Sequence, residues 1–159
     1  MRNVKFGVRL ATRADMDILV SHRQKMWREI TPRMSVRIKA GQKGYRNWLA
    51  RMMKEHRFAG IIAFVGERQG RAIIGSGGIW LHEIHPMPWL DGENEPYILS
   101  VYTEKGFRGL GVASRIMKVA MKWCRKKGYR SARLNASKMG RGLYSSLGWK
   151  RTWEMRRKL

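Results

Sequence analysis

The sequence predicts an α/β domain with a mixed sheet, and three observations carry this prediction. Apolar spacings of strands and helices alternate along the chain in the order strand, two helices, antiparallel strands, helix, strand, helix and strand. The strand–helix–strand unit from Pro96 to Ala136 should be right-handed, with parallel strands. The chain has 159 residues, 43% of them apolar, enough for one domain with a real core. We therefore expect residues 1–159 to form one domain.

The first third of the chain predicts one strand and two helices. Lys5–Leu10 alternates as a short strand, and Thr12 and Asp15 resemble a capping box that begins a helix. This helix should end near Trp27 or Ile30, because Pro32 disfavours helical backbone in the residue before it. Residues 34–41 show no clear pattern. A second amphipathic helix follows from the helical spacing of Tyr45, Trp48, Leu49, Met52 and Met53.

The middle of the chain predicts a hairpin and a central strand. Phe58–Val65 and Ala72–Leu81 are apolar strand segments, joined by a turn at Glu67–Arg71. His82–Glu95 contains prolines and a glycine and is expected to be a loop. The third strand is Pro96–Thr103.

The last part of the chain predicts a long helix, a strand, a short helix and a strand. Val112–Lys127 has an apolar helical face, and Gly128 is expected to end that helix. Ser131–Ala136 should be a strand, Gly142–Leu147 a short helix and Trp149–Arg156 the last strand.

The charge is unevenly distributed. The chain has 34 Lys and Arg against 11 Asp and Glu, a net charge of +23, and residues 105–159 contain Glu154 as their single acid. Such a surface suits a polyanion such as nucleic acid, a ribosome or an anionic membrane surface, and it equally suits a surface that serves solubility. Four of the acids gather within 13 residues and are expected to attract a cationic substrate: Glu83, Asp91, Glu93 and Glu95.

Several classes of protein are disfavoured. No stretch approaches the roughly 18 apolar residues of a transmembrane helix, and the first residues lack the apolar region of a signal peptide. The single cysteine, Cys124, rules out an internal disulfide and lies on the apolar side of its helix, so we expect a core residue. These features favour a cytoplasmic protein that does not act at a membrane.

The segment Val101–Ala113 has the features of an anion site. A strand leads through a turn with glycines into a helix, so backbone N–H groups can converge on one point. The helix N-terminus adds free donors and partial positive charge, and Arg108 adds a cation. A plain connection between strand and helix would explain the same short motif.

Two motifs resemble those of the GNAT N-acetyltransferases. Arg108-x-x-Gly111-x-Ala113 is similar to the family's pyrophosphate signature, and Leu143-Tyr-Ser-Ser-Leu-Gly-Trp149 is similar to its second conserved segment. The glycine-rich segment Gly75-Ser-Gly-Gly78 also stands at the expected place. The resemblance implies the GNAT fold: a mixed twisted sheet with an antiparallel N-terminal half and one parallel pair, flanked by about four helices.

The resemblance implies acetyl-CoA (coenzyme A) as the cofactor. The loop amides would hold its pyrophosphate and the strand at residues 101–103 its pantetheine. Family members often carry Asn where this chain has Ser137, so no contact is assigned to that residue. The positions implied for cofactor binding are Val101, Tyr102, Thr103, Arg108, Gly109, Leu110, Gly111, Val112, Ala113, Ser114, Asn135 and Tyr144.

The resemblance also implies direct attack of an acceptor amine on the thioester. Tyr144 matches the family's general acid, and a phenol is protonated at pH 7. A purely packed aromatic ring is the alternative for this residue. In several family members a Glu on the central strand is the base, which implies Glu95 at the start of that strand, with Glu83, His82 and His85 as rivals. A solvated loop side chain is the alternative for each of these four residues. Family members often form homodimers.

No metal site is expected, because His82 and His85 lack a third ligand with suitable spacing. The leading prediction is thus an acetyl-CoA-dependent N-acetyltransferase acting on a primary amine of a small molecule or a protein. The alternative is a nucleic-acid-binding or ribosome-associated module that retains the fold. An enzyme acting on a ribosomal or nucleic-acid-associated protein would combine both sets of features.

Overall fold

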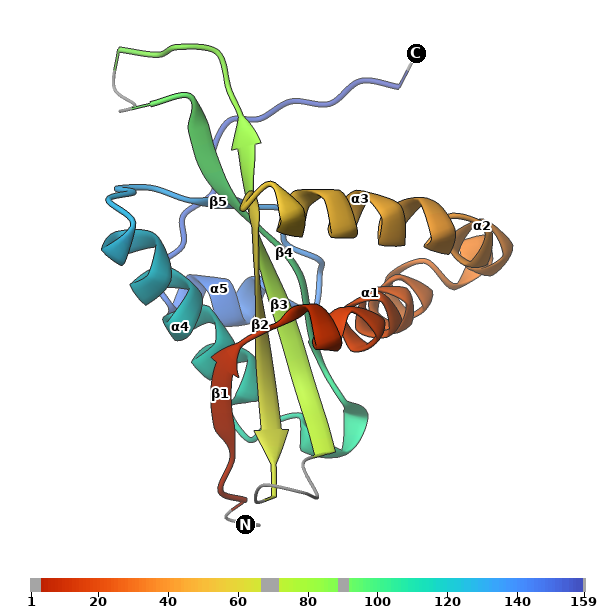
Figure 1. The fold of residues 1–159 in the computed structure, drawn as a ribbon. Helices are drawn as coiled ribbons and strands as arrows, with labels where there is room; N and C mark the ends of the chain where they lie inside the picture. The colour runs from red at the N-terminus through yellow and green to blue at the C-terminus, as the bar shows by residue number, and fades with distance from the viewer. Residues whose placement is uncertain (1–3, 67–71, 89–91, 159) are drawn as a thin grey trace.

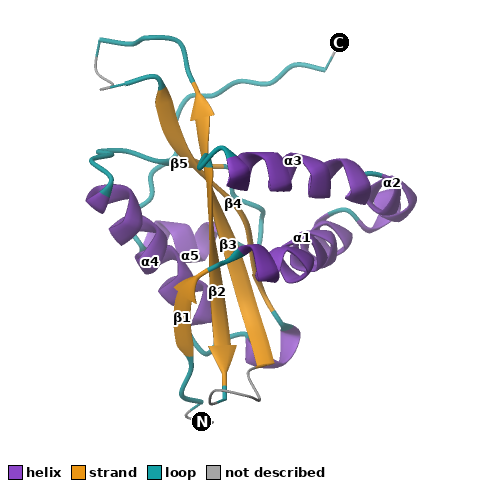
Figure 2. Ribbon diagram, viewed as in Figure 1, coloured by secondary structure: helices purple, strands orange, loops and turns teal. Residues whose placement is uncertain are grey.

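The computed structural model describes residues 4–66, 72–88 and 92–158, and these form a sheet with helices on both faces (Figures 1 and 2). The strand order is β1–β2–β3–β4–β5; the first four are antiparallel neighbours, and β5 runs parallel to β4. The predicted mixed sheet is confirmed. The strands are β1 (Gly7–Leu10), β2 (Phe58–Val65), β3 (Ala72–Glu83), β4 (Asn94–Thr103) and β5 (Arg133–Leu134).

The helices divide between the two faces (Figure 1). One face carries α1 (Met16–Ile30), α2 (Ser35–Ala40) and α3 (Gln42–Lys54), and the other carries α4 (Val112–Lys126) and α5 (Arg141–Ser146). About four helices were expected, and α2 is the addition among the described residues. It occupies the segment 34–41, where the sequence shows no clear period because the helix has only six residues.

Each face has its own apolar core. Gly77 lets α4 approach the sheet closely, because a Cβ at this position would lie 2.9 Å from Cγ2 of Ile116. The buried residues beneath α4 are Ile61, Ala63, Ile74, Ile79, Ile98, Val112, Ile116, Met117, Ala120 and Cys124. Those beneath α1 and α3 are Leu19, Val20, Leu49, Met52, Phe58 and Ile62. Burial of these apolar surfaces supplies the main stabilisation.

Strand β4 contains an irregularity in its middle. Leu99 pairs with Gly78 and Tyr102 pairs with Ser76, so β4 has one residue more than β3 over this stretch. Ser100, within it, has a φ of +54°, unusual for a residue other than glycine. This is a β-bulge, which bends a strand and interrupts its pairing.

The second edge of β4 is open beyond its first half. The parallel ladder to β5 contains two pairs, Tyr97 with Arg133 and Ile98 with Leu134. Among the described residues, no strand pairs with that edge from Leu99 to Thr103. Backbone groups along this edge are therefore available to a ligand, apart from the carbonyl of Thr103, which accepts a hydrogen bond from Arg108.

Two sequence predictions were wrong. His82–Glu95 is a loop only in part, because β3 continues to Glu83 and β4 begins at Asn94, so that His82 pairs with Glu95. The predicted strand Trp149–Arg156 is absent: residues 149–158 have no regular structure, and Trp153 is 97% exposed. Alternation of apolar residues suggested this strand, but a strand also needs an edge to pair with. The predicted turn Glu67–Arg71 lies outside the described residues.

A buried carboxylate joins β1 to the start of α1. Asp15 is 7% exposed and accepts two hydrogen bonds from Arg9, each 2.7 Å long. The backbone N–H of Thr12 also donates to Asp15, at 2.7 Å, as the predicted capping box requires. The Arg9 hydrogen bonds outweigh burial and lower the pKa of Asp15 to about 2.

Replacing Asp15 should destabilise the protein in a pH-dependent way. A carboxyl whose pKa falls from 3.8 to about 2 on folding contributes about 2 kcal/mol above its unfolded pKa. Asp15→Asn should lower the free energy of unfolding by about this amount at pH 7, measured by urea denaturation. The difference should shrink as the pH falls through 3.8 toward 2. Asp17→Asn, at a side chain that is 81% exposed, is the control, and an equal loss there would contradict this account.

Candidate functional site

The loop between β4 and α4 is built around two glycines. It contains a short 3-10 turn, Lys105–Phe107, and then Gly109 and Gly111 with φ values of +77° and +78°. Only glycine adopts this backbone without strain. No side chain caps the N-terminus of α4, and its first turn contains no acidic residue. Its amide donors and the positive end of the helix dipole are thus suited to an anion.

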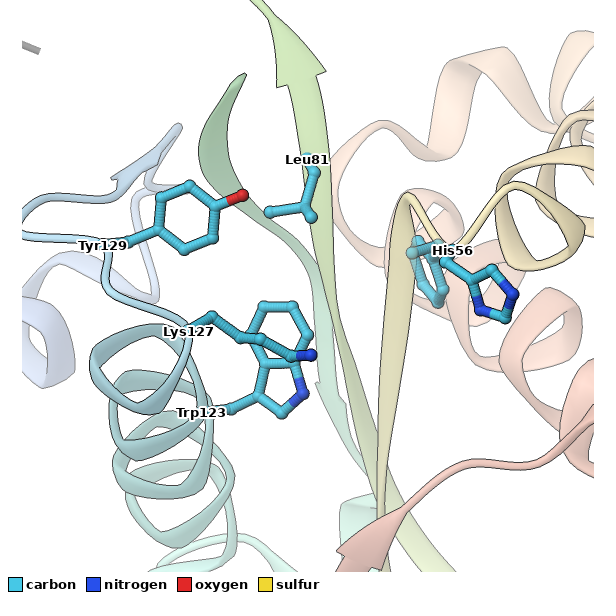
Figure 3. A pocket seen from close by; sticks show the side chains of 6 residues that line it. His56, Leu81, Trp123, Lys127 and Tyr129 are labelled. Carbon is cyan, nitrogen blue, oxygen red and sulfur yellow. The ribbon is translucent and has the colours of Figure 1, made fainter. Parts of the chain in front are cut away.

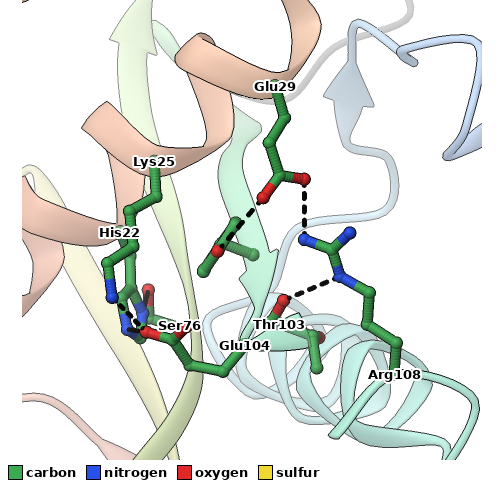
Figure 4. A network of polar contacts seen from close by, with 8 residues as sticks. His22, Lys25, Glu29, Ser76, Thr103, Glu104 and Arg108 are labelled. Carbon is green, nitrogen blue, oxygen red and sulfur yellow. Dashed lines mark hydrogen bonds and ion pairs between the residues drawn. The ribbon is translucent and has the colours of Figure 1, made fainter. Parts of the chain in front are cut away.

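Arg108 in this loop is held by α1 (Figure 4). Its Nη2 lies 2.7 Å from Oε2 of Glu29, and its Nε donates to the carbonyl of Thr103 at 3.1 Å. The hydroxyl of Tyr102 donates to the other oxygen of Glu29 at 3.3 Å. The guanidinium stays at the loop, but it has a carboxylate partner that the sequence did not suggest.

A second contact chain holds the beginning of the same loop. Oε1 of Glu104 lies 2.5 Å from Nζ of Lys25 and 3.2 Å from Nε2 of His22. The other ring nitrogen of His22 lies 2.9 Å from the hydroxyl of Ser76 on β3. Both His22 and Ser76 are buried. This chain ties α1 to β3 and to the end of β4 (Figure 4).

The protonation state of His22 follows from its surroundings. Burial, only partly offset by Glu104, lowers the pKa of His22 below its ordinary value, so the ring is neutral at pH 7. Nε2 lies 3.2 Å from Oε1 of Glu104 without hydrogen-bond geometry, whereas Nδ1 and the hydroxyl of Ser76 share a hydrogen bond of 2.9 Å. Burial opposes ionisation of Glu104, but Lys25 and His22 outweigh it and lower its pKa.

His22, Lys25 and Glu29 lie on one side of α1, because they are spaced at i, i+3 and i+7. They hold the first residue of the loop and its arginine. Sequence reasoning used only the apolar stripe of this helix and missed these residues. The helical spacing of these three polar residues could have indicated from the sequence that they lie on one side of the helix.

The positions predicted for the cofactor on β4 and in the loop are brought together by the strand, turn and helix. Tyr102 is 6% exposed and packs beside His22, with ring centroids 5.1 Å apart. Oγ1 of Thr103 is buried without a hydrogen-bond partner. Val101, Leu110 and Val112 pack into the core beneath α4. Ala113 and Ser114 lie in the first turn of α4, directly after the loop glycines.

The two other predicted cofactor residues lie beyond β5. Tyr144 in α5 packs against the core beneath α4, and its ring centroid is 6.3 Å from that of Trp149. Burial raises the pKa of Tyr144, so its phenol is protonated at neutral pH. Asn135 is exposed just after β5. Ser137 accepts a hydrogen bond from the N–H of Gly140, at 3.2 Å, and so shapes the start of α5.

Glu95 is the buried acid of the predicted acceptor group. It is 3% exposed, and its Oε2 lies 2.8 Å from Nε of Arg133 and 3.9 Å from Nε2 of His82. Glu83 and Glu93 are exposed, and strand alternation directs Glu83 to the face opposite His82. Asp91 lies outside the described residues.

Other candidate groups are separate from this region. Nδ1 of His85 lies 3.3 Å from the carbonyl of Pro86, and no three potential ligands gather around a metal position in the described chain. Cys124 is buried, and burial raises its pKa to about 11, as suits a core thiol. In the described part of the chain, no helix is long and apolar enough to span a bilayer.

A pocket of about 390 Å³ opens near the C-terminal end of α4 (Figure 3). Lys127 lies over the ring of Trp123, with its Nζ 5.8 Å from the ring centroid. The pocket contains none of the predicted site residues, and we assign it no role. Its lining residues are His56, Phe58, Leu81, Trp123, Lys127 and Tyr129.

Comparisons with known proteins agree with this geometry. Residues 22–149 match the acetyltransferase (GNAT) family model. A GCN5-related N-acetyltransferase from Ralstonia eutropha is 27% identical, with a TM-score of 0.86 over 98% of this chain and 99% of that one. A predicted acetyltransferase from Clostridium acetobutylicum, solved with acetyl-CoA, is 22% identical, with a TM-score of 0.83 over 98% and 96%.

More distant structures share the fold alone. An aminoglycoside antibiotic 6′-N-acetyltransferase from Acinetobacter haemolyticus is 12% identical, with a TM-score of 0.69 over 96% of this chain and 97% of that one. No curated protein matches the sequence.

Breaking the Glu29 contact should loosen the loop. The side chains of Arg108 and Glu29 are 39% and 21% exposed, so this ion pair is worth about 1 kcal/mol or less. Glu29→Gln should therefore speed amide hydrogen exchange of residues 104–111 by up to about fivefold, with β2 unchanged. Glu55→Gln, at an exposed acid, is the control. Unchanged loop exchange in Glu29→Gln would show that α1 does not hold the loop.

Proposed function

Because the chain belongs to the acetyltransferase (GNAT) family, we propose that it transfers the acetyl group of acetyl-CoA to a primary amine by direct attack in a ternary complex. One observation carries the proposal: the open edge of β4 leads straight into a loop with two left-handed glycines and an uncapped helix N-terminus. An extended chain that ends in a pyrophosphate fits such a surface.

The residues of this region suit the cofactor. Amides of residues 109–114 would bind the pyrophosphate, with Arg108 as the adjacent cation. No atom lies within 4 Å of a Cβ built at Gly109 or Gly111, so a ligand can approach the backbone there. The edge of β4 at residues 101–103 would hold the pantetheine and orient the thioester carbonyl. Acetyl-CoA supplies the acetyl thioester that is consumed.

Two side chains would move protons. Glu95, directly or through water, would accept the proton of the acceptor ammonium. Tyr144, kept protonated by burial, would donate to the leaving sulfur. The ammonium gives one proton to Glu95, and the free amine forms the bond to the acetyl carbon. The carbon–sulfur bond breaks as Tyr144 protonates the sulfur, and the second proton lost by the nitrogen reprotonates the Tyr144 phenolate. Asn135 would lie beside the cofactor.

The acidic side chains near the ends of β3 and β4 support a cationic acceptor. Glu83 and Glu93 are exposed, and they would draw an amine toward Glu95 on an otherwise basic protein. Asp91 would act with them. The acceptor would be a small molecule or a protein amine, and the buried single thiol Cys124 supports a reducing, cytoplasmic setting.

Removal of the Tyr144 hydroxyl tests the proposed acid. Tyr144→Phe should lower kcat by roughly 100-fold or more while acetyl-CoA affinity stays unchanged, because only proton donation is lost. The change should be measured by steady-state release of coenzyme A. Tyr129→Phe, with its ring also packed against the core beneath α4, is the matched control. A loss below threefold would make Tyr144 a packing residue only.

A second candidate role, association with nucleic acid, is favoured by the outer face of α4. Exposed basic residues recur there at helical spacing, and no acid follows until Glu154. Such a stripe can follow a phosphate backbone. This association is compatible with catalysis on a nucleic-acid-associated protein. The stripe consists of Arg115, Lys118, Lys122, Arg125 and Lys126.

Charge removal from α4 tests this role. Lys118, Lys122 and Lys126 together changed to Gln should weaken binding of a labelled DNA duplex and lower its salt slope by up to about 2.7. Fluorescence anisotropy at several salt concentrations gives both quantities. The control replaces three exposed lysines of the opposite face with Gln: Lys39, Lys43 and Lys54. An equal loss of DNA affinity in the two triple variants would show that binding depends on the net charge of the protein and not on the position of the α4 stripe.

A further inference from the structure

A row of aromatic side chains crosses the face of the sheet that carries α1 and α3. Ring centroids are 5.5 Å apart for Tyr45 and Trp48, and 5.4 Å apart for Trp48 and Trp80. Tyr97 continues the row, 6.3 Å from Trp80. His82 stands beside both, 5.1 Å from Trp80 and 5.8 Å from Tyr97. Each of these rings is half-buried, and Tyr45, Trp48 and Trp80 pack against the core beneath α1 and α3, so the row forms the edge of that core.

Three polar atoms along this row lack a hydrogen-bond partner although they are buried. They are Nε1 of Trp80, Nε2 of His82 and Oε2 of Glu95. Glu95 itself is 3% exposed, and its contact with Arg133 is an ion pair without hydrogen-bond geometry. Buried polar atoms without partners are rare and costly. An indole N–H, an imidazole nitrogen and a carboxylate oxygen along an aromatic row thus point to a ligand that combines polar and apolar parts.

The charges around the row limit which amines fit. Arg133 stands beside Glu95, and the guanidinium carbon of Arg23 lies 4.0 Å from the ring centroid of Tyr45. The latter contact also shows that a ring of the row already holds a cation. Around the row a polycation would meet three guanidinium groups, those of Arg23, Arg133 and Arg156, and two carboxylates, those of Glu95 and Glu154. A single ammonium would meet the carboxylate and the aromatic faces.

We propose that this row binds the acceptor and that the acceptor is a primary monoamine carried on an aromatic body. The inference rests on the proposed function, because Glu95 is the proton acceptor in both. The ammonium would lie beside Glu95 and His82, and the aromatic body would pack against Trp48, Trp80 and Tyr97. The ammonium gives one proton to Glu95, and the amine nitrogen then forms the bond to the acetyl carbon as the carbon–sulfur bond of the thioester breaks. The sulfur takes a proton from Tyr144, and the second proton lost by the nitrogen restores the Tyr144 phenol.

The test measures acetylation of chosen amines by the full chain at saturating acetyl-CoA. Tryptamine and 2-phenylethylamine should show kcat/KM values at least tenfold above those of spermidine, kanamycin and a lysine-containing peptide. Trp48→Leu and Trp80→Leu should each raise the KM for tryptamine at least tenfold, with the KM for acetyl-CoA changed less than twofold. Trp48→Phe and Trp80→Phe should each keep the KM for tryptamine close to that of the unchanged protein. Trp123→Leu on the α4 face is the matched control and should change neither KM.

The outcomes separate this inference from the function on which it rests. Preference for a polycation or a peptide would overturn the inference, and so would equal KM values in the Trp48→Leu and Trp123→Leu proteins. In both cases intact acetyl-CoA turnover would leave the acetyltransferase proposal standing. Failure to bind acetyl-CoA would instead refute both. If Trp80→Leu strongly lowers the midpoint of thermal unfolding, the KM values for tryptamine of Trp48→Leu, on helix α3, and of Trp80→Phe test the inference instead.

Discussion

Strand β4 pairs with two strands of different length, β3 and β5, and the candidate site depends on this difference in pairing. It pairs with β3 along its length but with β5 only at Tyr97 and Ile98. The bulge at Ser100 separates the strand into two parts. The first part, fixed between two strands, holds Glu95. The second part, with one open edge, runs into the glycine loop. One strand would thereby hold the proposed acceptor side and the proposed cofactor side in a fixed relation, which a reaction between two substrates requires.

The few acidic residues are used to hold basic elements in place. In a protein with a net charge of +23, the other basic residues would repel the basic loop between β4 and α4 and the positive end of the α4 dipole. Glu29 and Glu104 counter this by linking α1 to Arg108 and the loop entrance, while Asp15 links α1 to β1. Glu95 does the same for Arg133 on β5. The ring of His22 lies between Ser76 and Glu104 and contacts both, and because it is neutral it adds no further positive charge. α1 thus supports the loop and also lies beside the aromatic row.

The sequence predicted the parts of this structure that depend on local patterns. The order of strands and helices along the chain as far as the short helix α5, the long helix before Gly128 and the loop glycines follow from spacing and from backbone requirements, and all are present. The strand at Trp149–Arg156 was wrong because pairing is a non-local property. The extension of β3 to Glu83 was not predicted, because the prolines after it indicated a loop. Hydrogen bonds between β3 and β4 extend the pairing to this point, for example from the N–H of Ile84 to the carbonyl of Glu93. The partners of Arg108 and Glu95 could not be predicted, because residues distant in the sequence meet only in the fold. The roles of Tyr144 and Glu95 stay predictions.

The most direct test of the account is a calorimetric titration of the purified protein with acetyl-CoA, alongside Arg108→Ala and the exposed control Arg37→Ala. The account predicts saturable 1:1 binding, tighter than that of 3′,5′-ADP. Affinity should fall roughly 10- to 100-fold in Arg108→Ala, because a charge-assisted contact to phosphate is lost, and should be unchanged in Arg37→Ala. Absence of binding, or one affinity shared by all three proteins, would contradict the placement of the cofactor at the loop between β4 and α4.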